Sequence, residues 1–393
     1  MRAKFTFLLM CITLQFLFYS PQAWALQYKK AVGIVIGVLK WQDPGFRSFS
    51  KVNRLDKKLH KALLSKGVPK GQLALLLDKQ ATLKNITAAI KKQAQQASKN
   101  ATFIFYYAGH GIKYRGTTYL SNYDIVQRQP QRNGLSIPLL AKILRKYFRG
   151  KRILFLADAC YSGGLNEAAH TLAWSGFRSA VVTSATVRSI STGNWTYTQT
   201  LLAALKGNPF IDQDKNGQIS LLELKKEICG AMKFRESQRC GVGLFGVSPQ
   251  FTISKATRQK PLSSSYLKQW PIASYISAFS RGKWRRARIV QHKGKQVVAQ
   301  FFTYSGSYQK TLAASSIRKI RYKRYKVGQR LIVQWLGKIY PAKVLQVQGD
   351  FHLISYPGWS SFWDEWIMSN RILRTGWPKP SQRIRYIYKR RSR

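Results

Sequence analysis

The sequence predicts an α/β three-layer sandwich with a mostly parallel sheet, followed by one or two small all-β barrels. Up to about residue 253, short and nearly unbroken apolar runs alternate with stretches of helical period. Apolar runs without polar alternation are typical of strands that are buried on both faces, as in parallel sheets. Beyond residue 280, short strand-like segments are separated by glycine turns, which is typical of small barrels.

The sandwich is expected over residues 26–253. Its predicted strands are residues 31–38, 73–77, 102–107, 153–157 and 180–183. Between them, Leu83, Ile86 and Ile90 fall on one face of a predicted helix, and Leu139, Leu140, Ile143 and Phe148 mark a second helix. Strands that alternate with helices in this way indicate parallel crossover units.

Residues 1–25 have the pattern of a secretory signal peptide. A basic start precedes an apolar run over residues 5–19, and Ala23-Trp24-Ala25 forms a small-residue cleavage site. The alternative is a retained anchor, but the apolar run is shorter than the roughly 20 residues that a spanning helix needs. We therefore expect a secreted or periplasmic protein. In that oxidising space, Cys229 and Cys240 are candidates for a disulfide, which leaves Cys160 as the odd thiol.

The charge balance restricts the partners of the chain. The 393 residues carry 67 Lys and Arg against 14 Asp and Glu, for a net charge of +53, and 45% of them are hydrophobic. The apolar content excludes a disordered polycation. The charge indicates a polyanionic neighbour, such as nucleic acid, an anionic envelope polymer or an acidic protein.

The part after the sandwich divides into four predicted segments. Residues 254–280 are rich in Ser, Pro and Lys and are expected to be a linker. Residues 281–322 are a candidate for a degenerate small β-barrel, and residues 323–375 for a second one. Residues 376–393 form a basic tail that interleaves aromatic residues with Arg and Lys, which suits either a polyanion-binding arm or a solvated end.

The best candidates for catalysis follow two predicted strands. His110 stands in Gly109-His110-Gly111 after the strand 102–107, and Cys160 follows the strand 153–157, 50 residues later. Open α/β sheets place their chemistry at the carboxyl ends of strands. A thiolate at Cys160 would attack a carbonyl while the imidazole handles protons, and the neighbouring glycines let the backbone approach a substrate. The alternatives are a buried structural cysteine and a loop histidine with satisfied hydrogen bonds.

These segments resemble the caspase-like cysteine peptidases, in the metacaspase and bacterial caspase-family branch. The motifs that carry the resemblance are Phe103–Gly111 (FIFYYAGHG) and Ile153–Gly163 (ILFLADACYSG). The resemblance implies Cys160 as nucleophile, His110 as base, and the backbone N–H groups of Gly111 and Cys160 as donors to an oxyanion.

The resemblance also implies a preference for substrates with Arg or Lys at P1, the residue before the cleaved bond. Asp158 stands two residues before Cys160, where metacaspase-like enzymes have an acid that binds a basic side chain. Asp56 is the candidate for a second acid of that pocket, in the first helix. The alternative for Asp158 is a structural role in the turn at the end of its strand.

Residues 212–223 match a 12-residue EF-hand loop and predict a Ca²⁺ site. Carboxylate or amide side chains occupy positions 1, 3 and 5, a glycine is at position 6 and a glutamate at position 12. The alternative is a polar turn before a helix, with Ser220 as its N-cap. The expected ligands are Asp212, Asp214, Asn216, the carbonyl of Gln218, Ser220 and Glu223.

The segment 323–375 resembles a chromo-barrel or Tudor-knot domain, through Val327-Gly328, Tyr340-Pro341-Ala342 and Tyr356–Ile367 (YPGWSSFWDEWI). Such barrels cage a cation between aromatic rings or stack on nucleic acid. The alternative is that these rings form the barrel core. The candidate ligand surface consists of Trp335, Tyr356, Trp359, Trp363 and Trp366.

Together these features predict an exported caspase-like cysteine endopeptidase with a Ca²⁺ loop and basic targeting barrels. An enzyme of this kind is expected to have a reactive, low-pKa Cys160 paired with His110. The competing hypothesis is a catalytically inactive adaptor that binds polyanions or modified peptides through its barrels. An adaptor needs only a basic surface, and its binding would fall steeply with salt.

Overall fold

The computed structural model describes residues 25–257, 270–303, 306–335 and 338–376. The predicted signal peptide apart from Ala25, residues 258–269 of the predicted linker, and the basic tail from residue 377 lie outside the described residues.

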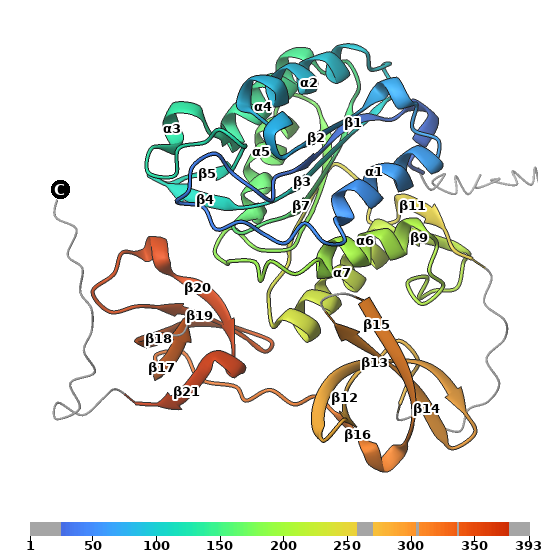
Figure 1. The fold of residues 1–393 in the computed structure, drawn as a ribbon, viewed down its shortest axis with the longest axis vertical. Coiled ribbons are helices and arrows are strands. Elements are labelled where there is room, and N and C mark those ends of the chain that lie inside the picture. The colour runs from blue at the N-terminus through green and yellow to red at the C-terminus, as the bar shows by residue number, and fades with distance from the viewer. Residues whose placement is uncertain (1–24, 258–269, 304–305, 336–337, 377–393) are drawn as a thin grey trace, which may run out of the picture.

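The central sheet has six strands in the order β10-β8-β7-β3-β1-β2 (Figure 1). All neighbouring strands are parallel except β10, which is antiparallel to β8. The strands are β1 (Val32–Gly37), β2 (Leu73–Leu77), β3 (Thr102–Ala108), β7 (Arg152–Asp158), β8 (Arg178–Thr183) and β10 (Gly241–Phe245). The five predicted strands are therefore confirmed. β1 and β3 are fully buried and β7 nearly so, whereas the edge strand β2 is mostly half-buried.

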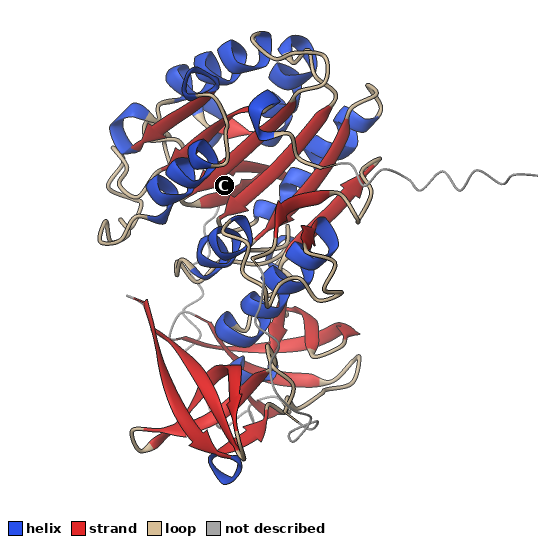
Figure 2. Cartoon of the chain, turned by 90° about the vertical axis from the view of Figure 1, so that its right-hand side faces the viewer, coloured by secondary structure: helices blue, strands red, loops and turns tan. Residues whose placement is uncertain are grey.

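Helices cover both faces of this sheet (Figure 2). One face packs against α2 (Leu83–Gln95), α4 (Ile137–Tyr147) and α5 (Leu165–Ala173). The other face packs against α1 (Leu55–Ser65), α6 (Thr196–Leu205) and α7 (Leu221–Glu236). Side-chain caps fix where helices begin, since Thr82 accepts a hydrogen bond from the backbone of α2 and Ser136 from that of α4. The three-layer α/β/α sandwich is thus confirmed.

Several short elements carry no clear sequence pattern and were not predicted. Between His110 and α4, a small antiparallel sheet is formed by β4 (Gly111–Tyr114), β5 (Thr117–Leu120) and β6 (Leu135–Ser136), with α3 (Pro130–Asn133) before β6. A two-stranded sheet pairs β9 (Gln218–Ser220) with β11 (Thr252–Lys255). Each of these elements is too short to show a period.

Two five-stranded antiparallel sheets follow the sandwich, each around its own apolar core. The first consists of β12 (Tyr275–Ser280), β13 (Lys283–Lys293), β14 (Gln296–Thr303), β15 (Gly306–Ala313) and β16 (Ile317–Lys319). The second consists of β17 (Arg330–Trp335), β18 (Lys338–Gln348), β19 (Phe351–Ser355), β20 (Glu365–Met368) and β21 (Ile372–Thr375). The predicted linker 254–280 is too long at its C-terminal end, because β12 already belongs to the first sheet.

Both small sheets pack against α7 and the segment after it (Figure 1). Arg288 of β13 pairs with Glu227 of α7, and Lys233 of α7 lies 2.6 Å from Asp350, which precedes β19. The guanidinium of Arg239 lies 4.1 Å over the ring of Trp366 in β20. These ion pairs and ring contacts dock the small sheets on the sandwich.

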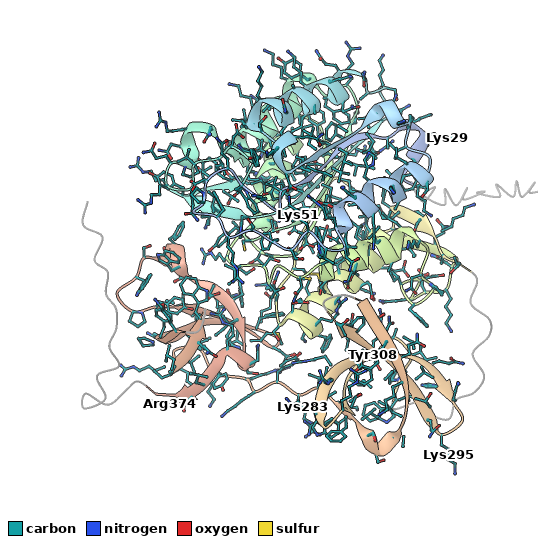
Figure 3. All side chains as sticks on the ribbon, viewed as in Figure 1. Lys29, Lys51, Lys283, Lys295, Tyr308 and Arg374 are labelled. Atoms are coloured by element: carbon teal, nitrogen blue, oxygen red, sulfur yellow. A yellow bond between two sulfur atoms is a disulfide. The ribbon has the colours of Figure 1, made fainter. Side chains whose placement is uncertain are left out.

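A disulfide joins Cys229 of α7 to Cys240, directly before β10, and Cys160 is the free cysteine of the described residues. None of the helices in the described ranges has the length and apolar character needed to cross a membrane. Basic side chains are spread over the molecule rather than gathered on one module, as the labelled Lys29, Lys51, Lys283, Lys295 and Arg374 illustrate (Figure 3).

Candidate active site

Cys160 and His110 lie at the carboxyl ends of neighbouring strands. In the β3–β7 ladder, Ala108 is opposite Asp158, and the histidine and the cysteine each come two residues later. The two backbones approach closely, since a Cβ added at Gly111 would lie 1.8 Å from the carbonyl oxygen of Cys160. Only glycine fits at position 111, because a side chain would collide with the backbone of Cys160.

The imidazole of His110 is fixed by one carbonyl and a group of aromatic rings. Its Nε2 lies 2.8 Å from the carbonyl oxygen of Arg47, and its ring packs 4.6 Å from that of Trp41 and 4.5 Å from that of Phe49. A carbonyl oxygen only accepts, so Nε2 carries a proton and Nδ1 of the neutral ring keeps its lone pair. Burial lowers the pKa of His110, which favours this neutral form.

Cys160 is half-buried, and its thiol lies against the segment that follows β8. The backbone N–H of Ser191 donates to its Sγ at 3.1 Å. Burial raises the pKa of Cys160, and the N–H groups of Ser191 and Gly111 only partly offset this. This direction is opposite to the predicted low pKa, so attack by this sulfur would require a base. No hydrogen bond joins Sγ to the His110 ring among the contacts of the described residues.

The residue after Cys160 has an unusual backbone conformation. Tyr161 has φ +54°, a left-handed conformation that costs a non-glycine residue of order 1–3 kcal/mol. Its N–H donates to the carbonyl of Ser189 at 2.9 Å. The turn that exposes Cys160 is therefore tied to the segment 184–195, which also supplies the N–H that contacts the sulfur.

A narrow cavity of about 30 Å³ lies beside Cys160 and is also lined by Asp158. The Oδ2 atom of Asp158 accepts a hydrogen bond from Thr198 at 2.7 Å. Burial raises the pKa of Asp158 to about 7. The other lining residues are Leu39, Phe49, Ser50, Ala108, Gly109, Ser191, Gly193, Asn194 and Trp195. Two of the sequence-predicted residues are thus brought together in one cavity.

Asp56 does not line this cavity, which corrects its predicted place in the substrate pocket. It is fully buried at the start of α1, and its Oδ2 lies 2.6 Å from Arg54, which also lies 2.6 Å from Asp78. Arg54 donates further to the carbonyl of Gly37 at 2.9 Å. The physical reason is that Arg54, two residues earlier in the sequence, already neutralises this carboxylate.

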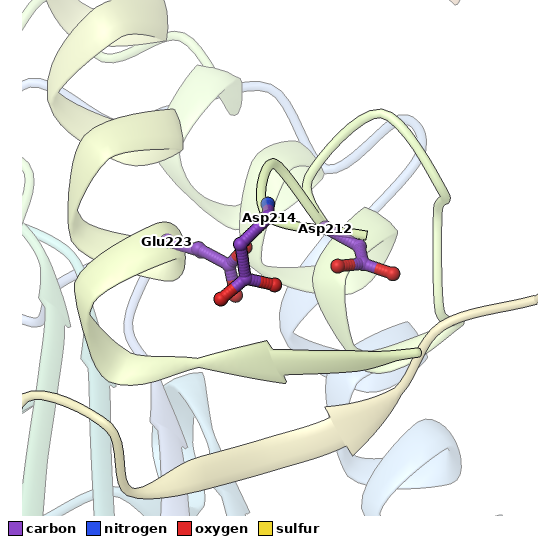
Figure 4. Close-up of side chains that lie close together, drawn as sticks. All are labelled: Asp212, Asp214 and Glu223. Atoms are coloured by element: carbon purple, nitrogen blue, oxygen red, sulfur yellow. Dashed lines mark hydrogen bonds between the residues drawn. The ribbon is translucent and has the colours of Figure 1, made fainter. Parts of the chain in front are cut away.

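The segment 212–223 folds so that three carboxylates converge (Figure 4). One oxygen from each of Asp212, Asp214 and Glu223 lies within 4.8 Å of the others. Burial and the neighbouring Glu223 and Asp214 raise the pKa of Asp212, although its N–H donors lower it. Crowded carboxylates of this kind fit a hard dication, which would remove their mutual repulsion.

The remaining predicted ligands partly serve the local fold. Ser220 and Glu223 form a capping box at the start of α7, so the N-cap alternative holds as well. The side chain of Asn216 accepts from the backbone N–H of Gln218 at 2.8 Å. Gln218 begins β9, which pairs with β11 and so anchors the end of the loop to the strand 252–255.

Four of the five predicted aromatic residues of the second small sheet line one pocket. Trp335, Tyr356, Trp359 and Trp363 surround it together with Tyr340, which was not among the predicted ligand residues. Trp366 does not line it, because its ring packs under the guanidinium of Arg239. The rest of the pocket wall comes from Tyr161, Arg188, Ser189 and Ile190 of the sandwich and from Phe362, Asp364 and Glu365 of the barrel segment. The aromatic pocket thus abuts the segment that contacts Cys160.

Three functional groups were missed from the sequence: the carbonyl of Arg47, the N–H of Ser191 and the hydroxyl of Thr198. Backbone groups leave no trace in residue identity, and Thr198 lies 40 residues from its partner Asp158. Only the fold brings these groups to the site.

Similarity to a known family covers most of the sandwich and the first small sheet. A family model described as "Caspase domain" matches residues 55–317, about two thirds of the chain. Protein GSU0716 of Geobacter sulfurreducens is 15% identical, with a TM-score of 0.38 over 59% of this chain and 98% of that one. Caspase-1 of Spodoptera frugiperda is 13% identical, with a TM-score of 0.39 over 61% of this chain and 95% of that one. No curated protein matches. The chain belongs to the caspase-domain family of cysteine peptidases.

Proposed function

We propose that this protein is an exported endopeptidase that uses Cys160 as nucleophile and His110 as base and cleaves after Arg or Lys. The observation that carries the proposal is the hydrogen bond between His110 Nε2 and the Arg47 carbonyl. It leaves Nδ1 as the proton acceptor of a ring at the end of the strand beside that of Cys160.

The chemistry follows from these two groups. Nδ1 of His110 takes the thiol proton as Sγ bonds to the substrate carbonyl carbon, and the N–H groups of Gly111 and Cys160 stabilise the resulting oxyanion. Collapse of this intermediate breaks the C–N bond, and the imidazolium returns the proton to the leaving amine. Water then hydrolyses the thioester, releases the acid and restores the thiol. Because the pKa of Cys160 is raised by burial, proton transfer accompanies attack rather than preceding it.

Asp158 supports the preference for basic residues. Its carboxyl group lines the cavity beside Cys160 and has no ion-pair partner among the described residues. A buried carboxylate without a counterion favours a cationic ligand, bidentately with Arg or as a point charge with Lys.

We also propose that Ca²⁺ binds residues 212–223, through Asp212, Asp214, Asn216, the carbonyl of Gln218, Ser220 and Glu223, and modulates activity. The loop leads directly into α7, and Glu236 at the other end of that helix accepts hydrogen bonds from Thr192 at 2.7 Å and Asn194 at 2.9 Å. Asn194 lines the cavity of Cys160. One rigid helix therefore connects the calcium loop to the wall of the active site.

The small sheets are proposed as targeting modules, the second of them chromo-barrel-like. Its aromatic pocket suits a cationic group, since an electron-rich ring face attracts positive charge. The net charge of +53 supports attachment to an anionic polymer, nucleic acid or acidic protein outside the cytoplasm.

The test is a cleavage assay on the mature chain with fluorogenic peptides that end in Arg, Lys or Asp, with and without Ca²⁺. Cleavage after Arg or Lys is expected, with a loss of at least about 10²-fold in His110→Ala and a complete loss in Cys160→Ala. No cleavage, combined with salt-sensitive binding to polyanions, would instead support the inactive adaptor. Preference for Asp would overturn the role of Asp158.

A further inference from the structure

A second cavity, of about 330 Å³, lies between the sandwich and the first small sheet. Its walls come from the start of α1, from α6 and α7, and from strands β12 to β15. It is large enough for a small organic ligand. Polar side chains are frequent in its wall, among them Gln199, Thr200, Asn208 and Gln300.

The charges that line this cavity do not balance. Glu227 and Arg288 are paired with each other, so together they contribute no net charge. The two further charged residues of the wall are Arg235 of α7 and Lys58 of α1, both cationic. The cavity therefore carries an excess of positive charge.

Arg235 lacks both a salt-bridge partner and an acceptor for one of its N–H groups among the described residues. One of its terminal nitrogens, Nη2, donates to Gln199 at 2.7 Å, and its guanidinium lies 4.1 Å over the ring of Phe302. Its Nε is buried and has no hydrogen-bond partner within the part of the chain that the structure describes. None of the carboxylates described there forms a salt bridge with it. A buried donor without an acceptor is destabilising, and more so when it is charged.

We propose that this cavity binds a small polyvalent oxyanion, of phosphate or carboxylate type, between Arg235 and Lys58. An oxyanion would accept from the free Nε–H of Arg235 and neutralise a guanidinium that has been removed from water. The amide and hydroxyl groups of the wall would satisfy the remaining oxygens. This site is separate from the cleavage chemistry, although Trp195 lines both this cavity and that of Cys160.

The test measures binding, not proteolysis, so it stands apart from the proposed peptidase activity. The full mature chain is used as the Cys160→Ala variant, which prevents self-cleavage, and is titrated calorimetrically with inorganic phosphate and with citrate at constant ionic strength. One saturable site is expected for at least one of them, and the preferred anion distinguishes a phosphate ligand from a carboxylate ligand.

The variants separate a specific site from general attraction to a cationic protein. Arg235→Gln is expected to raise the dissociation constant of the anion at least tenfold, and Lys58→Gln is expected to raise it several-fold. Lys57→Gln removes the same charge from the neighbouring exposed residue, which does not line the cavity, and is expected to leave the constant unchanged. Lys58 is exposed, so Lys58→Gln is expected to fold normally. The comparison of Lys58→Gln with Lys57→Gln therefore still tests the proposal if Arg235→Gln does not fold. Unsaturable binding of both anions, or equal constants for Lys58→Gln and Lys57→Gln, would overturn the proposal.

Discussion

Arg288 of the first small sheet forms a bidentate salt bridge with Glu227 of α7. The Nη2–Oε2 distance is 2.8 Å, and the two side chains are only 9% and 7% exposed. The partners are 61 residues apart in the sequence. This pair fixes the first small sheet on the sandwich and forms part of the wall of the 330 Å³ cavity.

Glu227→Gln is expected to destabilise the protein by about 3–5 kcal/mol, because it leaves the guanidinium of Arg288 buried without a counterion. Urea denaturation measures the loss. Lys226→Gln, an exposed neighbour on α7, is the matched control and is expected to stay within about 0.5 kcal/mol of the parent. Equal stabilities of the two variants would show that the pair does not hold the sheet.

Arg54→Gln tests whether Asp56 has a structural role. The substitution leaves the fully buried Asp56 carboxylate without its partner and is expected to cost about 3–5 kcal/mol. Lys51→Gln removes the other cation near Asp78, but Lys51 is 52% exposed, so a loss below about 1 kcal/mol is expected. Near-neutral stability of Arg54→Gln, with a raised KM for Arg peptides in Asp56→Asn, would restore Asp56 to the substrate pocket.

Binding of basic peptides is expected to depend on pH, because the carboxyl group of Asp158 titrates. Its pKa of about 7 in the free protein means that it is largely protonated below pH 7 and must ionise to pair with a cation. The affinity of Cys160→Ala for an Arg peptide should therefore rise with pH toward 7 and level off above it, by at most tenfold per pH unit. Fluorescence anisotropy measures it, and Asp158→Asn should bind weakly with a flat profile through this range. A flat profile in the parent would remove Asp158 from P1 recognition.

Glu223→Gln is expected to weaken Ca²⁺ binding by at least tenfold, because position 12 supplies the bidentate carboxylate of the loop. Calorimetric titration of the full chain with CaCl₂ measures it. Lys215→Gln changes a residue of the same loop that is not a predicted ligand and should leave binding intact. Absence of Ca²⁺ uptake by the parent protein would leave the capping box as the sole role of Glu223.

The sequence pattern was most informative where burial is complete. The strand 102–107 was predicted to within one residue, because it lies in the interior of a parallel sheet where polar residues are excluded. The strand 73–77 was predicted at its observed bounds from its apolar run, although it is the edge strand of the sheet and is mostly half-buried. The short strands β4, β5 and β6 left no such signature, and β12 fell inside the predicted linker. At the site, Asp56 was predicted as a pocket residue because it is an acid in the first helix. The sequence does not show that Arg54 pairs with it away from the cavity.

The sequence by itself determined the order of the parallel strands along the chain and the position of the thiol and imidazole at the ends of two of them. It also determined the spacing of the carboxylate and amide residues in the segment 212–223. Those features depend on local period and residue chemistry. Only the tertiary structure decided that the Arg47 carbonyl orients His110, that Arg54 neutralises Asp56, and that an aromatic pocket and a cationic cavity lie beside the active-site segment. Each of these features depends on which groups the fold brings together and removes from water. The identity of a single residue does not reveal that.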